Sequence, residues 1–290
     1  MILVINLQAG RGKASKYIGK IKSLLDCRKK KYDMVMTEYS GHAAVIAREY
    51  SNTESRLIYS LGGDGTLNEI TNGAVNTGSV VVNIPTGSGN DFIKSVTDLR
   101  DPMEIFERSF GAEERLIDTM KVNGRYCINI ASVGLDASVA HMANKIKKIP
   151  LLSGSLAYYL SIFLTLIKHR SYKLKVTIDS RTVEKEFLLI AVANGKYYGG
   201  GMKALPDAVI DDGLLDICMV DNMGTMKIIS LLNKYKKGEH KGLKQVTFET
   251  AKKIRIESSK PLQINIDGEI MQDRTVVIEV VPKSLRILSI

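Results

Sequence analysis

Short apolar runs alternate with helically spaced segments through the first hundred residues. The apolar runs lie at residues 1–6, 32–37, 56–61 and 79–84, and their length is typical of buried strands. Between them, residues 14–25, 41–50 and 66–75 repeat their apolar positions with the period of amphipathic helices. This alternation predicts a mostly parallel sheet covered by helices on both faces, which is a three-layer α/β domain.

From about residue 116 the pattern changes to strand-like runs separated by turns. We expect strands at 125–131, 173–178, 184–193, 214–220, 253–257, 262–266 and 275–280. We expect helices at 137–147, 151–168 and 225–237. The sequence therefore predicts an α/β domain at residues 1–120 and a mainly β domain at 121–290, with the last strand a candidate to return to the first domain.

A glycine-rich turn joins the apolar run at 56–61 to the helix at 66–75. It contains Gly62, Gly63, Asp64, Gly65 and Thr66. Glycine tolerates positive φ and lets a ligand approach the backbone, and the N-terminus of the following helix favours phosphate. A carboxylate at the centre of such a site would repel phosphate unless a cation lay between them. The turn therefore indicates a phosphate site with Mg²⁺, and the alternative is a plain tight turn.

A second glycine-rich turn, at residues 85–92, follows the apolar run at 79–84 and contains Asp91. Ligands of parallel sheets bind beyond the carboxyl ends of the strands. We therefore expect both turns to converge with the turns that follow Asn6 and Thr37. The Gly-Lys pairs do not fit the P-loop pattern, and Phe92 replaces the third glycine of a dinucleotide fingerprint. Two aspartates beside a phosphate instead predict Mg²⁺-assisted phosphoryl transfer.

The balance of 41 basic against 31 acidic side chains gives a formal net charge of +10 and favours an anionic partner. Candidates are an acidic membrane surface, a phosphorylated ligand and nucleic acid. The absence of Trp and the scarcity of aromatic residues argue against nucleic acid. Three scattered cysteines, Cys27, Cys127 and Cys218, predict reduced core thiols and a cytoplasmic protein.

Residues 151–167 form an uncharged segment between basic flanks. The segment is short and contains several polar residues, which disfavours a membrane span. It indicates either a core or groove-lining helix, or a helix that contacts a membrane surface. The flanking cations are candidates for docking to an acidic surface or form an ordinary solvated face: Lys145, Lys147, Lys148, Lys168 and Arg170.

The two glycine-rich turns together resemble those of the bacterial diacylglycerol kinase-like lipid kinases, which are relatives of the sphingosine kinases. The resemblance continues in order along nearly the whole chain, in Thr37 with Gly41-His42-Ala43, Asn194-Gly195 with Gly199-Gly200-Gly201, Pro206-Asp207-Ala208 with Asp211-Asp212-Gly213-Leu214, and Asp267-Gly268-Glu269. The turn at 62–66 alone is less specific, because NAD kinases and phosphofructokinases resemble it too. One departure is Leu7, where the family commonly has Pro, and it leaves the turn glycines intact.

The resemblance implies roles for individual residues. The implied ATP site comprises Asn6, Thr37, Gly62, Gly63, Asp64, Gly65, Thr66, Glu69, Ser88 and Asn90. An implied network of aspartate, water and Mg²⁺ involves Asp64, Asp91 and Asp118. A second, structural Mg²⁺ would be held by the Asp212 carboxylate and the carbonyls of Val209 and Leu214.

The implied general base is Asp267, and the like charge of the neighbouring Glu269 should raise its pKa. Taken from the residues alone, Asp267-Gly268 is equally typical of a hairpin turn, and Asp212 of a plain turn.

The implied reaction is phosphoryl transfer from ATP to a lipid hydroxyl with the help of Mg²⁺. Diacylglycerol, giving phosphatidic acid in phospholipid biosynthesis, is the first candidate, and a sphingoid base or a prenol is the alternative. The enzyme would be cytoplasmic, attached peripherally to an acidic membrane surface, and a homodimer is compatible with the sequence. A kinase for a soluble substrate in the manner of NAD kinase would not need the turn at 85–92 in its present form. A non-catalytic, nucleotide-regulated membrane protein is the other alternative. It would not need the acidic residues that phosphoryl transfer requires, yet the sequence has an acidic residue at every one of these positions.

Overall fold

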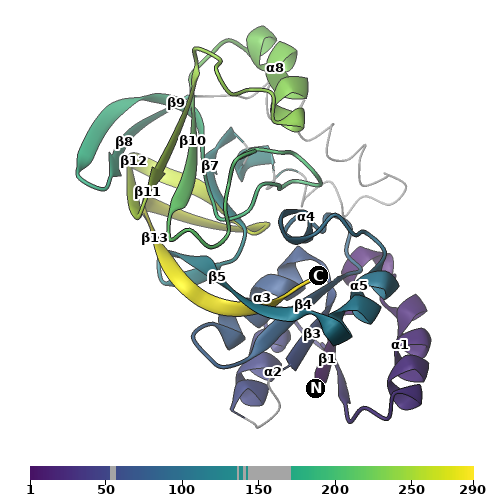
Figure 1. The fold of residues 1–290 in the computed structure, drawn as a ribbon. Helices are drawn as coiled ribbons and strands as arrows, with labels where there is room; N and C mark the ends of the chain where they lie inside the picture. The colour runs from purple at the N-terminus through teal and green to yellow at the C-terminus, as the bar shows by residue number, and fades with distance from the viewer. Residues whose placement is uncertain (53–56, 136, 140–141, 143–170) are drawn as a thin grey trace.

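The computed structural model describes residues 1–52, 57–135, 137–139, 142 and 171–290 (Figure 1). It contains an N-terminal half with helices on both faces of a parallel sheet and a C-terminal half built mainly of strands. The predicted fold class is confirmed. The strands and helices expected before residue 76 lie within two residues of their observed bounds.

The N-terminal sheet consists of β1 (Ile2–Ile5), β2 (Asp33–Met36), β3 (Leu57–Gly62) and β4 (Val80–Pro85), in the parallel order β2-β1-β3-β4. The connecting helices are η1 (Ala9–Arg11), α1 (Ser15–Cys27), α2 (His42–Ser51) and α3 (Asp64–Ala74). Ile2 and Val4 pack with α2 and α3, whereas Leu3 and Ile5 pack with α1. Alternate side chains of one strand thus serve the two faces of a three-layer domain.

The last strand links the two halves of the molecule. The end of β13 (Glu269–Ser289) pairs in parallel with β4, and its first half pairs antiparallel with β12 (Lys253–Ile266). β5 (Glu113–Val122) runs antiparallel along β13 and follows α4 (Ile93–Val96), α5 (Pro102–Arg108) and η2 (Ser109–Gly111). Figure 1 shows β13 in yellow passing from one half into the other. Among the described residues, 13 strands therefore form one continuous sheet.

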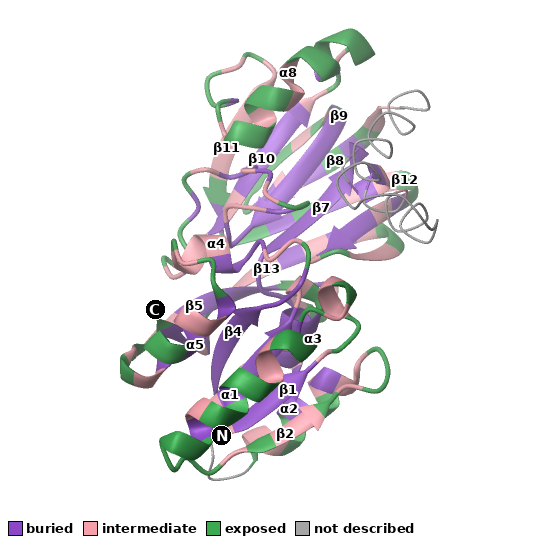
Figure 2. Cartoon of the chain, turned by 90° about the vertical axis from the view of Figure 1, so that its right-hand side faces the viewer, coloured by how far each residue is buried: buried purple, intermediate pink, exposed green. Residues whose placement is uncertain are grey.

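The C-terminal half continues this sheet in the order β11-β10-β9-β7-β12-β13. Its other elements are β6 (Arg125–Cys127), β7 (Ile130–Gly134), β8 (Tyr172–Ile178), β9 (Arg181–Ala193), β10 (Leu215–Asp221), α8 (Thr225–Lys237) and β11 (Val246–Ala251). β8 pairs with both β9 and β12, so these strands and β7 close into a ring around an apolar core. In Figure 2 the strands around this core are largely coloured as buried. Side chains of α8 pack against the sheet in a second apolar cluster.

Several sequence expectations need correction. The strand expected at 125–131 is two strands, because the backbone at Ile128 and Asn129 turns to donate hydrogen bonds to a side chain. The strands expected at 253–257 and 262–266 are the single strand β12, whose register shifts between Glu257 and Leu262. β5 lies mostly before the expected start of the second domain, and β11 was not expected.

The expected helices at 137–147 and 151–168 fall almost entirely outside the described residues. Within the described part of the chain, no helix combines the length and apolarity needed to cross a bilayer. Cys127 and Cys218 are buried free thiols, as expected, but Cys27 is exposed because it ends α1 on the solvent side.

Candidate active site

Three glycine-rich turns, at the carboxyl ends of β1, β3 and β4, touch one another through their backbones. A Cβ atom on Gly10 would lie 2.1 Å from the carbonyl oxygen of Thr86, and one on Gly87 would lie 2.4 Å from the Cα of Gly63. Any side chain at these positions would clash, so glycine is required for the turns to meet. The N–H groups of Thr86 and Gly87 both donate to the carbonyl of Gly62, at 2.9 and 3.0 Å. The turns that were expected to converge therefore lie together at one edge of the sheet.

Short polar side chains fix the shape of these turns. Asn6 donates to Thr66 Oγ1 (3.0 Å) and accepts from the N–H of Gln8 (2.9 Å), so it joins the ends of β1 and β3. Asn90 has φ near 49° and donates to the carbonyls of Pro85 (3.3 Å) and Gly87 (2.9 Å). Ser88 is exposed at the tip of its turn, and Gly65 is exposed in the first turn of α3. Asn6, Thr66 and Asn90 thus order the backbone to which a phosphate could bind.

Glu69 connects α3 to the turn that follows Thr37. Its two carboxylate oxygens accept hydrogen bonds from the N–H groups of Gly41 (2.9 Å) and Ala43 (3.2 Å), at the beginning of α2. A carboxylate there satisfies free N–H groups and complements the positive end of the helix dipole. Thr37 is half-buried, and its N–H donates to the carbonyl of Ile5. The turn after β2 is therefore held beside the others by Glu69.

Asp64 is the first residue of α3 and is surrounded by other acidic groups. Its Oδ1 accepts from the N–H groups of Asp91 (2.7 Å) and Phe92 (3.3 Å). Burial and, after it, the charges of Asp91 and Asp267 raise the pKa of Asp64, the two N–H donors oppose these effects, and the net pKa is about 6. The site thus holds negative charge that lacks full compensation, and a divalent cation would supply that compensation.

Asp91 links the two halves of the molecule across the site. Its Oδ1 accepts from Lys94 Nζ (2.7 Å), which also donates to the carbonyl of Gly89 (3.0 Å). Its Oδ2 accepts from the N–H of Gly200 (2.7 Å), in a turn where Gly199, Gly200 and Gly201 all have positive φ. Sequence reasoning missed Lys94, although its place one helical turn beyond Asp91 was a usable signal.

Asp267 lies in the two-residue hairpin loop between β12 and β13. Asp267 and Gly268 both have positive φ, at 47° and 94°, as such a loop requires. The carboxylate points to the junction of β6 and β7, where Oδ2 accepts from the N–H of Ile128 (2.8 Å). Oδ1 accepts from those of Asn129 (3.2 Å) and Ile130 (2.9 Å). The residue is thus both a hairpin residue and a half-buried acceptor of hydrogen bonds.

A side chain of α3 also contacts Asp267 Oδ2. In the amide orientation that satisfies both of its ends, Asn68 donates to Oδ2 (3.2 Å) and to the carbonyl of Tyr126 (3.0 Å). Asn68 is buried one helical turn after Asp64, so it connects the hairpin to the helix that begins at the glycine-rich turn. Sequence reasoning missed this residue as well, because its partner is distant in the chain.

Burial raises the pKa of Asp267 to about 6, and the backbone N–H donors and the Cys127 thiol oppose this effect. Burial and the charge of Asp267 together raise the pKa of Cys127. Burial, and not the expected charge of Glu269, is the main cause that raises the pKa of Asp267; Glu269 is partly exposed and forms an ion pair with Arg125.

The loop that contains Asp212 is anchored by Asp118, which is fully buried. Asp118 accepts from the N–H groups of Gly213 (2.6 Å) and Lys283 (2.7 Å). Asp212 Oδ1 accepts from the N–H of Leu214 (3.0 Å), and the N–H of Val209 donates to Asp216 Oδ2 (3.4 Å). Asp118 therefore fastens the loop to the end of β13.

Asp216 adds an acidic group that sequence reasoning missed. Burial raises the pKa of Asp216 to about 6, and the charges of Asp212 and Asp207 act in the same direction. Oxygen ligands from Asp212, Asp216 and loop carbonyls would suit Mg²⁺, which relies on a few carboxylates and water. In the part of the chain that is described, no group of three or more His, Cys, Asp or Glu side chains forms a metal site by itself.

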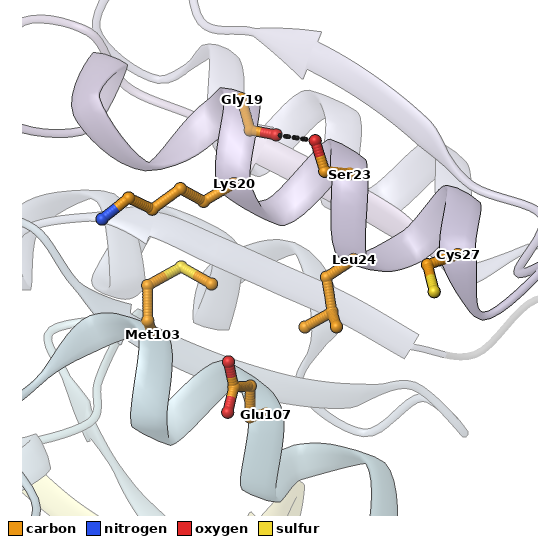
Figure 3. Close-up of a pocket in the computed structure, with 7 residues that line it drawn as sticks. All are labelled: Gly19, Lys20, Ser23, Leu24, Cys27, Met103 and Glu107. Atoms are coloured by element: carbon orange, nitrogen blue, oxygen red, sulfur yellow. Dashed lines mark hydrogen bonds between the residues drawn. The ribbon is translucent and has the colours of Figure 1, made fainter.

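Two hollows lie away from these turns. An apolar pocket of about 80 Å³ lies between the C-terminal sheet and α8, and its walls include Leu189, Tyr198, Ile228, Leu232 and Tyr235. A wider groove of about 630 Å³ lies between α1 and α5 (Figure 3). Its lining comprises Gly19, Lys20, Ser23, Leu24, Cys27, Met103 and Glu107, none of which belongs to the glycine-rich turns or the acidic groups described above.

Comparison with known proteins matches both halves of the chain to one kind of enzyme. Residues 1–122 match the diacylglycerol kinase catalytic domain, and residues 129–289 match the YegS C-terminal NAD kinase beta sandwich-like domain. The chain is 28% identical to a diacylglycerol kinase of Bacillus subtilis (strain 168), over 92% of this chain and 88% of the relative. It is 31% identical to a diacylglycerol kinase of Staphylococcus aureus (strain NCTC 8325 / PS 47), over 80% of this chain and 74% of the relative.

Solved structures agree with this match. A crystal structure of a diacylglycerol kinase from Bacillus anthracis str. Sterne shares the fold, with a TM-score of 0.76 and 23% identity over 99% of this chain and 95% of that chain. Another crystal structure from the same strain has a TM-score of 0.80 at 25% identity and covers 99% of this chain and 96% of that chain. The fold, the glycine-rich turns and these matches define a kinase. The chain belongs to the bacterial diacylglycerol kinase-like lipid kinase family.

Proposed function

We propose that this lipid kinase transfers the γ-phosphate of ATP to the free hydroxyl of diacylglycerol, with Mg²⁺, to give phosphatidic acid. The observation that carries the proposal is that Asp64 and Asp91 lie together at the contacting glycine-rich turns, while Asp267, from the other half of the chain, is near enough for its charge to act on Asp64. The names of the Bacillus subtilis and Staphylococcus aureus relatives support diacylglycerol as the acceptor.

The nucleotide phosphates would bind to backbone N–H groups of the turns at 62–65 and 87–89, at the N-terminus of α3. The N–H of Gly87 is excepted, because it donates to the carbonyl of Gly62. Asn6, Thr66 and Asn90 hold these turns in shape, and Glu69 fixes the neighbouring turn after Thr37. Asp64 and Asp91 fit a divalent cation, because burial and mutual repulsion raise the pKa of Asp64. When bound, Mg²⁺ would offset charge on the phosphates during transfer.

In this proposal Asp267 accepts the proton of the acceptor hydroxyl. Its carboxylate accepts from three backbone N–H groups and from the Cys127 thiol, and Oδ2 also faces the amide of Asn68. The hydroxyl would bind Oδ2 in place of the Asn68 amide. The hydroxyl oxygen then forms a bond to the γ-phosphorus, its proton passes to Asp267, and the bond from that phosphorus to the β-phosphate oxygen breaks, so that ADP leaves.

The apolar pocket beneath α8 would hold part of an acyl chain. Its lining residues are mostly aliphatic, with the hydroxyls of Tyr198 and Tyr235 in contact at 3.1 Å. NAD has no long hydrocarbon to place in such a pocket, so the pocket favours a lipid acceptor over the reaction of an NAD kinase. A sphingoid base or a prenol would also fit, and the enzyme would meet any of these lipids by associating peripherally with a membrane.

The experiment is incubation of the purified protein with Mg²⁺, labelled ATP and a total membrane lipid extract, followed by identification of the labelled lipid. Label in phosphatidic acid supports the proposal. Label in a sphingoid base phosphate or a prenyl phosphate would replace the acceptor, and label in added NAD without labelled lipid would overturn the proposal. Omitting Mg²⁺ in a parallel reaction tests the requirement for the cation.

A further inference from the structure

The outward face of α8 carries apolar side chains that nothing in the described structure covers. Met226 is 79% exposed and Ile229 is 46% exposed, and their spacing of three residues puts them on one stripe of the helix. The adjoining stripe, with Ile228, Leu232 and Tyr235, lines the apolar pocket. The first half of α8 is therefore apolar both on its outward stripe and on the stripe that faces the sheet. Exposed apolar groups of this kind mark interaction sites when they occur beside polar residues of suitable charge.

Lysines surround this apolar stripe. Between residues 225 and 244 the chain has six lysines and a single acidic residue, Glu239. The lysines are Lys227, Lys234, Lys236, Lys237, Lys241 and Lys244, and all six are exposed. The ion pair of Lys241 with Asp207 lies at the surface, so it leaves the positive excess of the region largely intact. Figure 2 shows α8 as an exposed helix at the end of the C-terminal half.

We propose that the outward face of α8 docks on an anionic lipid bilayer. Met226 and Ile229 enter the boundary between headgroups and acyl chains, and the lysines bind the anionic headgroups. Charge complementarity favours an acidic surface, and the apolar stripe favours one that also offers hydrocarbon. Nucleic acid offers stacked bases instead, and the outward stripe of α8 has no aromatic side chain to stack on them.

This inference rests on the proposed function for its purpose, because the lipid substrate resides in the same bilayer. α8 borders the bilayer with one stripe and the apolar pocket with the other, so an acyl chain that enters the pocket would leave the bilayer beside this helix. The helix ends at Gly238, whose φ of 77° turns the chain so that Lys241 and Lys244 follow in the next loop.

The experiment is cosedimentation with vesicles of phosphatidylcholine alone or of phosphatidylcholine with phosphatidylglycerol, without ATP or substrate. Two double variants test the two parts of the face, M226S/I229S and K234Q/K237Q. The matched control K22Q/K30Q removes the same charge from exposed lysines of the N-terminal half. We expect the wild-type protein to bind the anionic vesicles only, and each α8 variant to lose about tenfold or more in affinity, while the control loses no more than about threefold.

Equal losses in the control and in K234Q/K237Q would overturn the proposal, because binding would then depend on net charge alone. Wild-type affinity in M226S/I229S would overturn it too. Conversion of a wild-type dimer into a monomer by M226S/I229S in sedimentation would show that the face is a subunit interface instead. Phosphorylation of a short-chain diacylglycerol dissolved as monomers should be unchanged in M226S/I229S. Because vesicle binding needs no turnover, an inactive protein that still binds through α8 would refute the proposed function and leave this inference standing.

Discussion

The substitution Asp64→Asn should separate the charge of the site from its shape. In the folded protein Oδ1 of Asp64 accepts from the N–H groups of Asp91 and Phe92, and an asparagine oxygen can accept the same two hydrogen bonds. Oδ2 accepts no hydrogen bond from the residues that the structure describes, so the new amide group displaces no donor there. The amide group is also neutral, so it removes the repulsion between residue 64 and the carboxylate of Asp91. The variant should therefore fold, and it should lack only the negative charge.

The magnitude follows from the pKa of Asp64, which burial and neighbouring charges raise from 3.8 to about 6. Each tenfold change in proton affinity corresponds to ~1.4 kcal/mol, so the ionised carboxylate lowers the free energy of unfolding by at most about 3 kcal/mol. The folded chain binds this proton more tightly than the unfolded chain. The cost is therefore absent below pH ~4, grows as the pH rises to ~6, and is complete above that.

The assay is thermal unfolding of wild type and Asp64→Asn in the presence of a chelator, at pH values of about 4.5 and 7.5. At the higher pH the variant should melt higher, by roughly 2–4 °C for each kcal/mol gained, and at the lower pH the difference should fall to about a third of that value. In the presence of Mg²⁺ and ATP its turnover should fall by more than ~10²-fold, because the carboxylate that suits the cation is gone. A folded variant with wild-type turnover, or with no pH-dependent gain in stability, would refute this reasoning.

Three further substitutions test other parts of the site. Asp267→Asn should lower turnover by ~10²–10⁴-fold and leave ATP affinity nearly unchanged, because it removes a proton acceptor and no phosphate contact. Turnover is measured by steady-state kinetics and ATP affinity by calorimetric titration. A collapse of ATP affinity would assign Asp267 to the nucleotide site. Asp212→Ala should lower the melting temperature and abolish any stabilisation by added Mg²⁺, whereas an unchanged melting curve and Mg²⁺ response would exclude a structural cation in that loop. Lys94→Met should lower the free energy of unfolding by about 3 kcal/mol in chemical denaturation at neutral pH, because it leaves the buried carboxylate of Asp91 unpaired. Recovery of stability in Lys94→Arg is expected, and full stability of Lys94→Met would show that the ion pair contributes little.

The parts of this molecule that the sequence predicts well are those determined by neighbours along the chain. The apolar period of β3 and α3 and the glycines between them specify a strand, a turn and a helix within about twenty residues. The same local chemistry offered a hairpin loop as one of two interpretations of Asp267 and Gly268, and the structure has this loop. In each case the physical cause lies within a few residues of its effect.

Contacts between distant segments were beyond sequence reasoning. The N–H groups that hold the Asp267 carboxylate lie more than 130 residues away in the chain, and no period or motif announces them. The pairing of Glu269 with Arg125 is of the same kind. β12 differed from the prediction for another reason. Pro261 and its polar neighbours are typical of a turn, but the residues before and after them both pair with β13, so the strand continues across a register shift.

Asp216 shows how burial changes the meaning of a residue. In the sequence it is one of several aspartates near 207–216, and only the fold reveals that it is partly buried and that burial and its acidic neighbours raise its pKa. The orientation of α8 also depends on tertiary packing. Its residue range was predicted correctly, yet which stripe would face the sheet, and so leave Met226 and Ile229 outside, follows from the packing of Ile228 and Tyr235.

The most direct test of the central proposal is a transfer assay with labelled ATP, Mg²⁺ and two acceptors in one reaction, a short-chain diacylglycerol in detergent micelles and NAD. The wild-type enzyme should label the diacylglycerol to give phosphatidic acid and leave NAD unlabelled, and the labelled product should disappear when Mg²⁺ is chelated. Labelling of NAD in place of the lipid, or lipid labelling that survives chelation of all divalent cations, would contradict the account.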